Sequence, residues 1–473
     1  MSDDFEDEAD EYEVGDEYGE SDGYGGDEDG DGSDPSWGGQ SAAAGGDAGA
    51  AAAWGELADE HEGPAPDGSA PPVGAVWAQL IGQPEAVARL GRAAVAARRV
   101  LGGAGGPSVN AMTHAWLLTG PPGSGTGQAA RAFAAALECT GPRPGCGRCP
   151  QCHTTLGGTH PDVSVVRSDQ LSIGVDIARK LVRDCAMAPA GGRWQIIVFE
   201  DADRLTEGAA NVLLKGIEEP AARTVWILCA PSSRDLLPTI LSRCRQLALR
   251  SPAAADVAAA LVERDGAAPE QAMHAARAAQ GDYERARSLV LDPQAAARRA
   301  AVLRLPGDAR DLGRALSGAQ ALVDAAEAEA KAATETLDAT ETEELKLALG
   351  YGQGKGAGSA RGVAGSAGLL KELETKQKRR LTRMQRDCLD RALTDLLAFY
   401  RDVLALQLTG GGHGGAAPEP VHADQAAQAA ESAAGSRPED TLRRIDAILG
   451  AREAIAANVA PLLAVEAMAV SLG

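Results

Sequence analysis

AWLLTGPPGSGTGQAAR, residues 115–131, is the stretch that decides the fold. Its apolar run, Trp116 to Leu118, leads into a loop that begins at Gly120, and an alanine-rich helix follows. This arrangement is typical of a phosphate-binding loop, whose full pattern is G-x-x-x-x-G-K-[ST]. In such a loop the backbone N–H groups cradle the phosphates, the lysine reaches the β- and γ-phosphates, and the hydroxyl binds Mg²⁺.

The loop keeps this frame but lacks the residues that do the chemistry. Thr126 stands at the lysine position and Gly127 at the hydroxyl position, and the first lysine of the chain is Lys180. We therefore expect a nucleotide-binding fold that does not hydrolyse ATP. The degenerate phosphate loop comprises Gly120, Pro121, Pro122, Gly123, Ser124, Gly125, Thr126 and Gly127. An ordinary Gly/Pro turn between a strand and a helix is the alternative.

Charge is distributed very unevenly along the chain. The net charge is −22 over 473 residues, but residues 1–75 contain 23 Asp or Glu and no Lys or Arg. The remainder holds 45 basic and 67 − 23 = 44 acidic side chains, a net of +1. The first 75 residues have too few apolar side chains to offset the entropy of ordering, so they are predicted to be disordered. A solubilising tail is favoured over a mimic of nucleic acid.

The length of the whole chain, 473 residues, predicts two to four domains, and the protein is expected to be cytoplasmic. No apolar run approaches the roughly 20 residues that span a bilayer, and the acidic N-terminus does not resemble a signal peptide. In the reducing cytoplasm, thiols serve more often as metal ligands or core residues than in disulfides. Four isolated cysteines are expected to be buried: Cys185, Cys229, Cys244 and Cys388.

A cluster of four cysteines is the strongest local motif. Within 14 residues lie Cys139, Cys146, Cys149 and Cys152, among glycines and prolines that let the chain wrap around one ion. Four thiolates suit a tetrahedral Zn²⁺, and a site closed by four sulfurs is structural because no position is left for water. His153 could compete as a ligand. Unligated or disulfide-linked cysteines are the alternative.

Further strands and helices alternate after this cluster. A buried strand, 194–199, ends in Glu200 and Asp201, which are placed as Mg²⁺-binding acids would be beside a phosphate loop. The helix 208–219 ends in Glu218 and Glu219, where the macrodipole disfavours negative charge, so we expect a partner facing them or a solvated surface. The alternation predicts a parallel α/β sheet. Basic residues of a later helix, among them Lys376 and Arg386, could touch DNA phosphates or form a solvated face.

These motifs together divide the chain into four parts. We expect a disordered tail over 1–75, an α/β core with a phosphate-loop-like motif over 76–250 that contains the zinc module 139–153, a helical lid over 251–302, and a helical domain over 303–473 with a Gly-rich loop at 349–368.

The chain resembles the clamp-loader subunits of bacterial DNA polymerase III, and among them the delta-prime type. The resemblance is strong over about 76–295 and weaker over 369–473. It depends on the strings IGQPEAV, HAWLLTGPPGSG, the four-cysteine cluster, HPDV, IIVFEDADRLTEGAANVLLKGIEEP, LPTILSRC and NVAPLLAVEAM. It implies an AAA+ core, a helical lid and a helical collar that assembles a five-membered ring.

The resemblance also implies partners and roles. The arginine of a Ser-Arg-Cys string in this family reaches the ATP of a neighbouring motor subunit, and Arg243 matches it. Implied partners are the motor subunits, the delta subunit, the sliding clamp and primed DNA, within a DNA-directed DNA polymerase holoenzyme (a nucleotidyltransferase) associated with the nucleoid. No membrane is implied.

The chain departs from the motor subunits in three places. The loop lacks its lysine and hydroxyl, and the residues Ala230-Pro231-Ser232-Ser233 stand where the motor subunits have threonines. The motor subunits also carry an arginine soon after a glycine of the lid, whereas here Arg285 follows Gly281 one position later than in that pattern. These departures favour a non-hydrolysing delta-prime role, in which the chain alone is not an enzyme and does not hydrolyse ATP in its own site. The rivals are an ATP-hydrolysing motor of the gamma/tau type with an atypical loop, and a zinc-dependent adaptor unconnected with replication.

Overall fold

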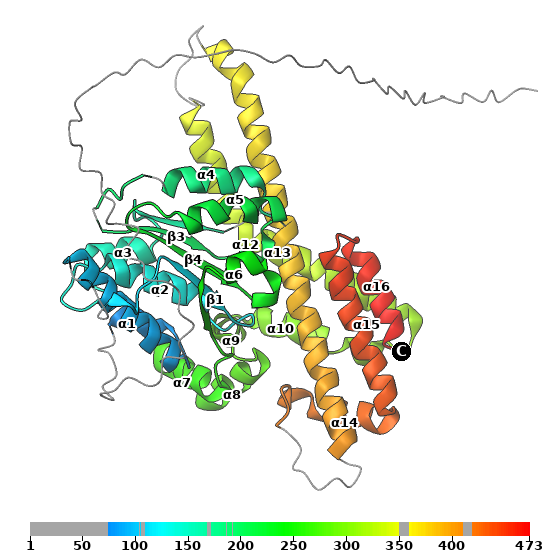
Figure 1. Cartoon of the computed structure of the whole chain (residues 1–473). Helices are drawn as coiled ribbons and strands as arrows, with labels where there is room; N and C mark the ends of the chain where they lie inside the picture. Colours follow the sequence, from blue (N-terminus) through cyan, green and yellow to red (C-terminus); the bar gives the residue numbers. More distant parts are fainter. Residues whose placement is uncertain are drawn as a thin grey trace, which may run out of the picture. The chain divides into compact units, whose positions relative to one another are not determined.

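A five-stranded parallel sheet forms the centre of the first half of the described chain (Figure 1). The computed structural model describes residues 74–103, 105, 109–167, 172–185, 187–191, 193–349, 359–409 and 419–473. The predicted disordered tail therefore lies outside the described residues, apart from its last two positions. The order of the strands is β2-β3-β4-β1-β5. Their bounds are β1 Ala115–Thr119, β2 Val163–Val166, β3 Gln195–Phe199, β4 Thr224–Ala230 and β5 Arg245–Ala248.

Both faces of the sheet are buried, as expected for parallel strands covered by helices. Every residue of β3 and β4 is buried. Because successive side chains point to opposite faces, Trp116 packs with one hydrophobic cluster and Leu117 with the other. The register pairs Trp116 with Ile227 across the strands β1 and β4, which builds the first cluster from one row of side chains.

Helices cover the two faces in separate groups (Figure 1). The first cluster contains buried residues of α1 (Pro84–Leu101) and α2 (Thr126–Glu138), and α3 (Pro150–Leu156) packs against α2. The second contains buried residues of α4 (Val175–Cys185), α5 (Glu207–Glu218) and the short α6 (Pro238–Leu241). The predicted parallel α/β core is therefore confirmed.

A small helical bundle follows the sheet. Its helices are α7 (Ala254–Asp265), α8 (Pro269–Ala278) and α9 (Tyr283–Leu291). They share a core of Val257, Leu261 and small alanines, against which Ile81 also packs. This contact places the bundle over the segment that precedes α1.

Among the described residues of the last part, the regular elements are all helices. Its helices are α10 (Pro293–Val302), α11 (Leu305–Asp308), α12 (Leu312–Ala348), α13 (Ser359–Thr409), α14 (Ala426–Gly435), α15 (Pro438–Ala456) and α16 (Pro461–Ser471). One apolar cluster, which includes Leu389, Phe399 and Val465, joins helices from α12 to α16. Among the described helices, none has an apolar stretch long enough to span a bilayer.

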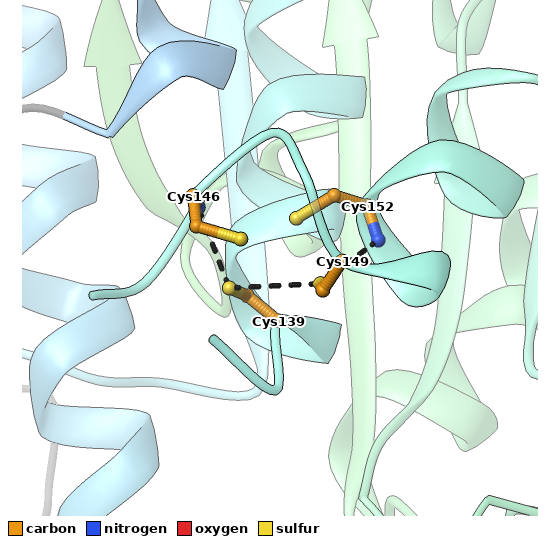
Figure 2. A group of neighbouring side chains, drawn as sticks. All are labelled: Cys139, Cys146, Cys149 and Cys152. Carbon is orange, nitrogen blue, oxygen red and sulfur yellow. Dashed lines mark hydrogen bonds between the residues drawn. The ribbon is translucent and has the colours of Figure 1, made fainter. Parts of the chain in front are cut away.

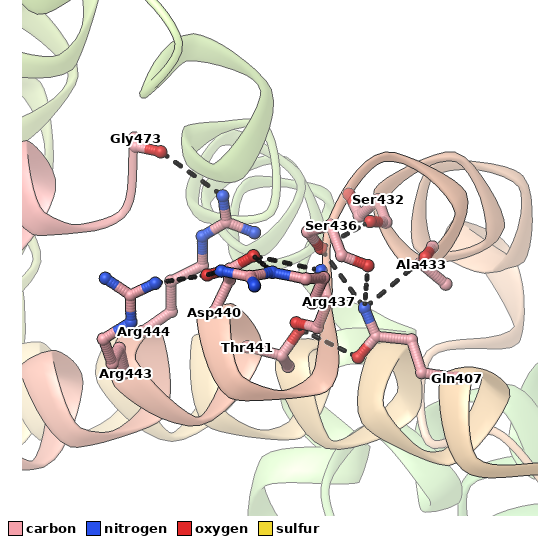
Figure 3. Close-up of polar contacts among 10 residues, drawn as sticks. All are labelled: Gln407, Ser432, Ala433, Ser436, Arg437, Asp440, Thr441, Arg443, Arg444 and Gly473. Carbon is pink, nitrogen blue, oxygen red and sulfur yellow. Dashed lines mark hydrogen bonds and ion pairs between the residues drawn. The ribbon is translucent and has the colours of Figure 1, made fainter.

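Polar contacts fasten the turn between α14 and α15 to α13 (Figure 3). The Gln407 side chain on α13 donates to the backbone oxygen of Ser436 at 2.8 Å, and it accepts from the Thr441 hydroxyl at 2.9 Å. One amide group therefore links three successive segments of the helical domain.

The helix α13 begins earlier than expected. We predicted a Gly-rich loop over 349–368, whereas α13 already begins at Ser359. The glycines at 362, 365 and 368 therefore lie within a helix, although each costs about 1 kcal/mol relative to alanine. The helix α13 has 51 residues. Extending an existing helix by one turn does not repeat the unfavourable nucleation step, so the cost of these glycines does not end the helix.

Candidate functional site: a degenerate phosphate loop, an exposed arginine and a four-cysteine cluster

The predicted phosphate loop lies between β1 and α2. Gly123 and Gly125 have φ values of +82° and +85°, which only glycine adopts without strain. The Gly120 N–H donates to the oxygen of Ala230 at the end of β4, so the loop starts at the carboxyl edge of the sheet. The α2 helix then begins at Thr126, with Gly125 as its N-cap. The frame of the loop is thus built locally, although its lysine and hydroxyl positions hold Thr126 and Gly127.

The loop is closed by contacts from its own chain. A Cβ at Gly120 would lie 2.4 Å from the Ser124 Oγ, and a Cβ at Gly123 would lie 2.5 Å from the Asp282 Cβ. The bundle α7–α9 therefore rests directly on the loop through Asp282. On the other side, the buried Gln83 side chain donates to the Ser124 oxygen at 3.1 Å.

A cavity of about 330 Å³ adjoins the loop. Thr126, Asp282 and Glu284 are among the side chains that line it, together with Arg264. Arg264 stacks on the ring of Tyr283 with its guanidinium carbon 5.4 Å from the ring centre. The cavity beside the loop is thus lined by two carboxylates and one guanidinium.

The two predicted Mg²⁺-binding acids are engaged by arginines of the same chain. The Glu200 carboxylate accepts from the Nε of Arg131 at 2.8 Å and from the Nε of Arg167 at 3.0 Å, and its side chain is only 8% exposed. The Asp201 carboxylate accepts from Arg383 of α13 at 2.9 Å. Charge-assisted hydrogen bonds of this kind are the strong ones. A divalent cation would have to displace these guanidinium groups.

The side chain of Arg285, on α9, points away from the phosphate loop. Arg285 Nη2 lies 2.6 Å from the Asp395 Oδ1 on α13, and the two side chains are 14% and 4% exposed. The contact is a close ion pair rather than a well-aligned hydrogen bond. Arg285 therefore ties α9 to α13 instead of facing the phosphate loop.

Arg243 lies two residues after the last residue of α6. Its Nη1 donates to the Thr239 oxygen at 2.9 Å and to the Ser242 hydroxyl at 3.0 Å. Its Nη2 lies 2.5 Å from the Glu218 Oε1. The Arg243 side chain is 37% exposed, so the guanidinium is ordered and still accessible.

The four clustered cysteines converge on one point, as their spacing predicted (Figure 2). The sulfurs of Cys139, Cys146, Cys149 and Cys152 all lie within 4.8 Å of one another, and none forms a disulfide. A tetrahedral zinc with thiolates at about 2.3 Å requires sulfurs about 3.8 Å apart. The Cys139 and Cys149 sulfurs are 4.0 Å apart, so the arrangement fits a zinc ion.

Backbone N–H groups already stabilise thiolates in this cluster. The Cys146 N–H points to the Cys139 sulfur at 3.4 Å, and the Cys152 N–H points to the Cys149 sulfur at 3.4 Å. Burial would raise the pKa of Cys149, but hydrogen bonds from the Cys152 and Thr140 backbones outweigh it and lower that pKa to about 5. The Arg148 N–H likewise lowers the pKa of Cys146. His153, the competing ligand, is not part of the cluster.

The isolated cysteines behave as predicted. Cys185, Cys229, Cys244 and Cys388 are all buried. Burial raises the pKa of Cys185 and of Cys244 to about 12. These thiols remain protonated at neutral pH and serve as small apolar side chains.

Several functional contacts were not predicted from the sequence. Arg131 and Arg167 were not identified as partners of Glu200, and Glu218 was not identified as the partner of Arg243. The position of Glu218 did give a signal, because a carboxylate at a helix C-terminus suggested a facing charge. Nothing in the local spacing indicated Arg383, which lies 182 residues from Asp201.

The fold and this site together are those of a parallel α/β domain with a phosphate-loop-like turn. The strand order is β5-β1-β4-β3-β2, the turn follows β1, and two acids follow β3. Residues 107–253 match the family model described as "DNA polymerase III, delta subunit". This region of the chain is thus similar to a delta-type subunit of DNA polymerase III.

Individual relatives agree with this family. The chain is 42% identical over 147 residues to the DNA polymerase III subunit delta' of Pseudomonas aeruginosa, which covers 30% of this chain and 44% of the relative. It is 31% identical over 179 residues to the gamma/tau subunit of Mycobacterium tuberculosis, which covers 37% of this chain and 29% of the relative. The chain thus spans less than half the length of these relatives.

Among solved structures, the chain is similar to a DNA polymerase III gamma subunit-related protein of Thermotoga maritima. It covers 63% of this chain and 99% of its own, at 15% identity and a TM-score of 0.28.

Proposed function

We propose that this chain is a non-hydrolysing, delta-prime-like subunit of a DNA polymerase III clamp loader. In this proposal it supplies Arg243 in trans to the ATP of a neighbouring motor subunit and helps to load the sliding clamp onto primed DNA. Its partners are the motor subunits and the delta subunit. The observation that supports the proposal most directly is the pairing of both acids, Glu200 and Asp201, with arginines of the same chain.

The loop itself supports the absence of hydrolysis. An active site of this kind needs a lysine on the phosphates, a hydroxyl and an acid on Mg²⁺, and a group that orients water. Here Thr126 and Gly127 provide neither the charge nor the metal ligand. Asp282 lies on the loop at Gly123, and Arg285 is bound to Asp395 instead. The loop lysine, the loop hydroxyl and the arginine of α9 thus all differ from those of an active ATP site.

The exposure of Arg243 supports the donor role. An arginine supplied to a transferring phosphoryl group stabilises the charge that develops there, and it increases the rate by about 10³–10⁵ in well-studied GTPases. Such a residue must be reachable by another subunit and must be held near one orientation. Arg243 satisfies both conditions, since its side chain is 37% exposed and three contacts hold it.

The cysteine cluster has a structural role in this proposal. Cys139, Cys146, Cys149 and Cys152 would hold one zinc ion with all four positions filled, so the metal would stabilise the connection between α2 and α3 and take no part in hydrolysis.

Reconstitution with the partner subunits tests the proposal. We expect Arg243→Ala to lower the clamp-loading ATPase rate of the complex by about tenfold or more, a conservative fraction of what such arginines supply elsewhere. The matched control is Arg179→Ala, which removes another exposed arginine, on α4. An unchanged rate with Arg243→Ala would reject the donor role.

The isolated chain distinguishes this proposal from an ATP-hydrolysing motor. We expect the purified chain to hydrolyse Mg-ATP more slowly than about 0.1 s⁻¹, well below typical kcat values. Faster turnover that Glu200→Gln abolishes would instead identify the chain as a motor.

A further inference from the structure

The guanidinium of Arg243 is fixed by contacts of two different kinds. Its Nη1 donates to the Thr239 oxygen and to the Ser242 hydroxyl, both within its own turn of chain. Its Nη2 meets the carboxylate of Glu218, which comes from the helix α5. Of these three contacts, only the one with Glu218 is ionic and reaches beyond the segment 239–243, so Glu218 sets the direction in which Nη2 points.

The backbone that carries Glu218 is held firmly. The two carbonyls before Glu218 are both satisfied by side chains of the core. Trp226 Nε1 donates to the Gly216 oxygen at 3.0 Å, and the His114 ring nitrogen lies 2.8 Å from the Ile217 oxygen. Ile217 is fully buried. The last turn of α5 is therefore fixed to the sheet, and its terminal carboxylate has a defined position.

Stability alone does not account for this carboxylate. The Glu218 side chain is 44% exposed, and exposed ion pairs contribute little to folding. At the last residue of α5 its negative charge also opposes the helix macrodipole. The one contact that the structure describes for this side chain is with Arg243.

We propose that Glu218 is a positioning residue that holds Arg243 ready for transfer to the phosphates of a neighbouring subunit's nucleotide. This inference depends on the donor role proposed above. Because the pair is exposed, it breaks easily when a more highly charged triphosphate approaches. The Thr239 and Ser242 contacts keep Nη1 oriented while Nη2 changes partner. Glu218 thus restricts the search of a long, flexible side chain without competing strongly for it.

The test measures the ATPase of the reconstituted complex with changes at Glu218. We expect Glu218→Ala to lower kcat by about threefold to fivefold, which is the factor that an exposed ion pair is worth, with the KM for ATP changed less than about twofold. Glu218→Gln keeps an oxygen acceptor and should give a smaller decrease. The matched control is Glu219→Gln, which removes a charge from the next position and leaves the Arg243 contact intact.

A double variant separates positioning from a general structural effect. If Glu218 acts through Arg243, then Glu218→Ala with Arg243→Ala should be no slower than Arg243→Ala alone. A double variant that loses the product of the two single effects, or a Glu218→Ala complex as fast as the wild type, would overturn the inference while the donor role stands. If Arg243→Ala itself has no effect, the donor role and this inference both fail.

Discussion

At the scale of single residues, His422 shows how a buried group is kept neutral. The Nδ1 of His422 accepts a hydrogen bond from Arg299 Nη2 at 2.8 Å, and its Nε2 lies 3.0 Å from the backbone oxygen of Asp395. The backbone N–H of His422 donates to the Asp402 carboxylate. Burial lowers the pKa of His422 below 6.5, and the facing Arg299 charge lowers it further, although Asp395 and Asp402 oppose this. Protonation at Nδ1 would remove an acceptor and place two positive charges together.

We therefore expect acid to destabilise the helical domain through His422. In the unfolded chain the imidazole titrates near 6.5, whereas in the folded chain its pKa is lower. The folded state binds fewer protons, so the stabilisation is complete above pH 6.5 and is lost as the pH falls from there towards the folded pKa. Thermal unfolding between pH 7.5 and 5 should show a Tm that falls more steeply for the wild type than for His422→Gln.

The neighbouring Asp424 provides a check, because it titrates in a different range. Burial would raise its pKa, but hydrogen bonds and charge from Arg299 outweigh this and lower it to about 2. Its contribution is thus lost only below about pH 4. Equal slopes for wild type and His422→Gln above pH 5 would contradict the role of His422.

At the scale of elements, the cysteine cluster offers a candidate metal site in a segment with little hydrophobic packing. The segment between α2 and α3 contains few apolar side chains. Its turn glycines lie tightly against their neighbours. A Cβ at Gly141, for example, would lie 2.6 Å from the Cys146 sulfur. The sulfurs would repel one another as thiolates without a cation. A bound zinc ion would therefore couple the fold of this module to the metal.

We expect one zinc per chain in protein purified without chelators, measured by elemental analysis. Cys149→Ser should reduce this stoichiometry and lower the Tm by about 5–10 °C, as expected for the loss of a few kcal/mol in a domain of this size. The matched control is Cys244→Ser, which changes a buried cysteine outside the cluster and should retain the zinc. A metal content near zero in the wild type would remove the zinc proposal.

The elements also show which features the sequence can predict. The phosphate-loop frame, the acids after β3 and the cysteine cluster depend on short spacings, and the structure places each where the pattern indicated. Their partners could not be predicted, because charge pairs such as Arg383 with Asp201 join residues far apart in sequence.

The basic stretch of α13 illustrates this limit. The sequence allows DNA contacts or a solvated face for this stretch, whereas Arg380 is only 8% exposed and pairs with Asp338 and Glu341 of α12. Lys376 also pairs with Glu341. Lys376 and Arg380 thus join α13 to α12, and only the tertiary structure reveals this.

At the scale of the whole molecule, charge is divided between a tail and a nearly neutral body. Residues 1–75 hold 23 of the 67 acidic side chains and no basic ones, while the rest of the chain has a net charge of +1. The structural role of those residues lies outside the described part of the chain, but their electrostatic effect does not depend on a fold. A protein with net charge near zero tends to associate, and added Asp and Glu increase solubility.

We expect a chain that starts at residue 74 to unfold at the same temperature as the complete chain, within about 2 °C, because the sequence it lacks has few apolar side chains to add to a core. Its solubility at low salt should nevertheless fall by about twofold or more, as measured by light scattering against concentration.

The matched control keeps the length of the tail and replaces its 23 acids with Asn and Gln. If charge is the cause, this neutral tail should behave like the truncated chain, and added salt should reduce the difference from the wild type because it screens the repulsion. A neutral tail as soluble as the acidic one would instead attribute the effect to the length of the segment, and truncation without any effect would direct attention to a basic partner.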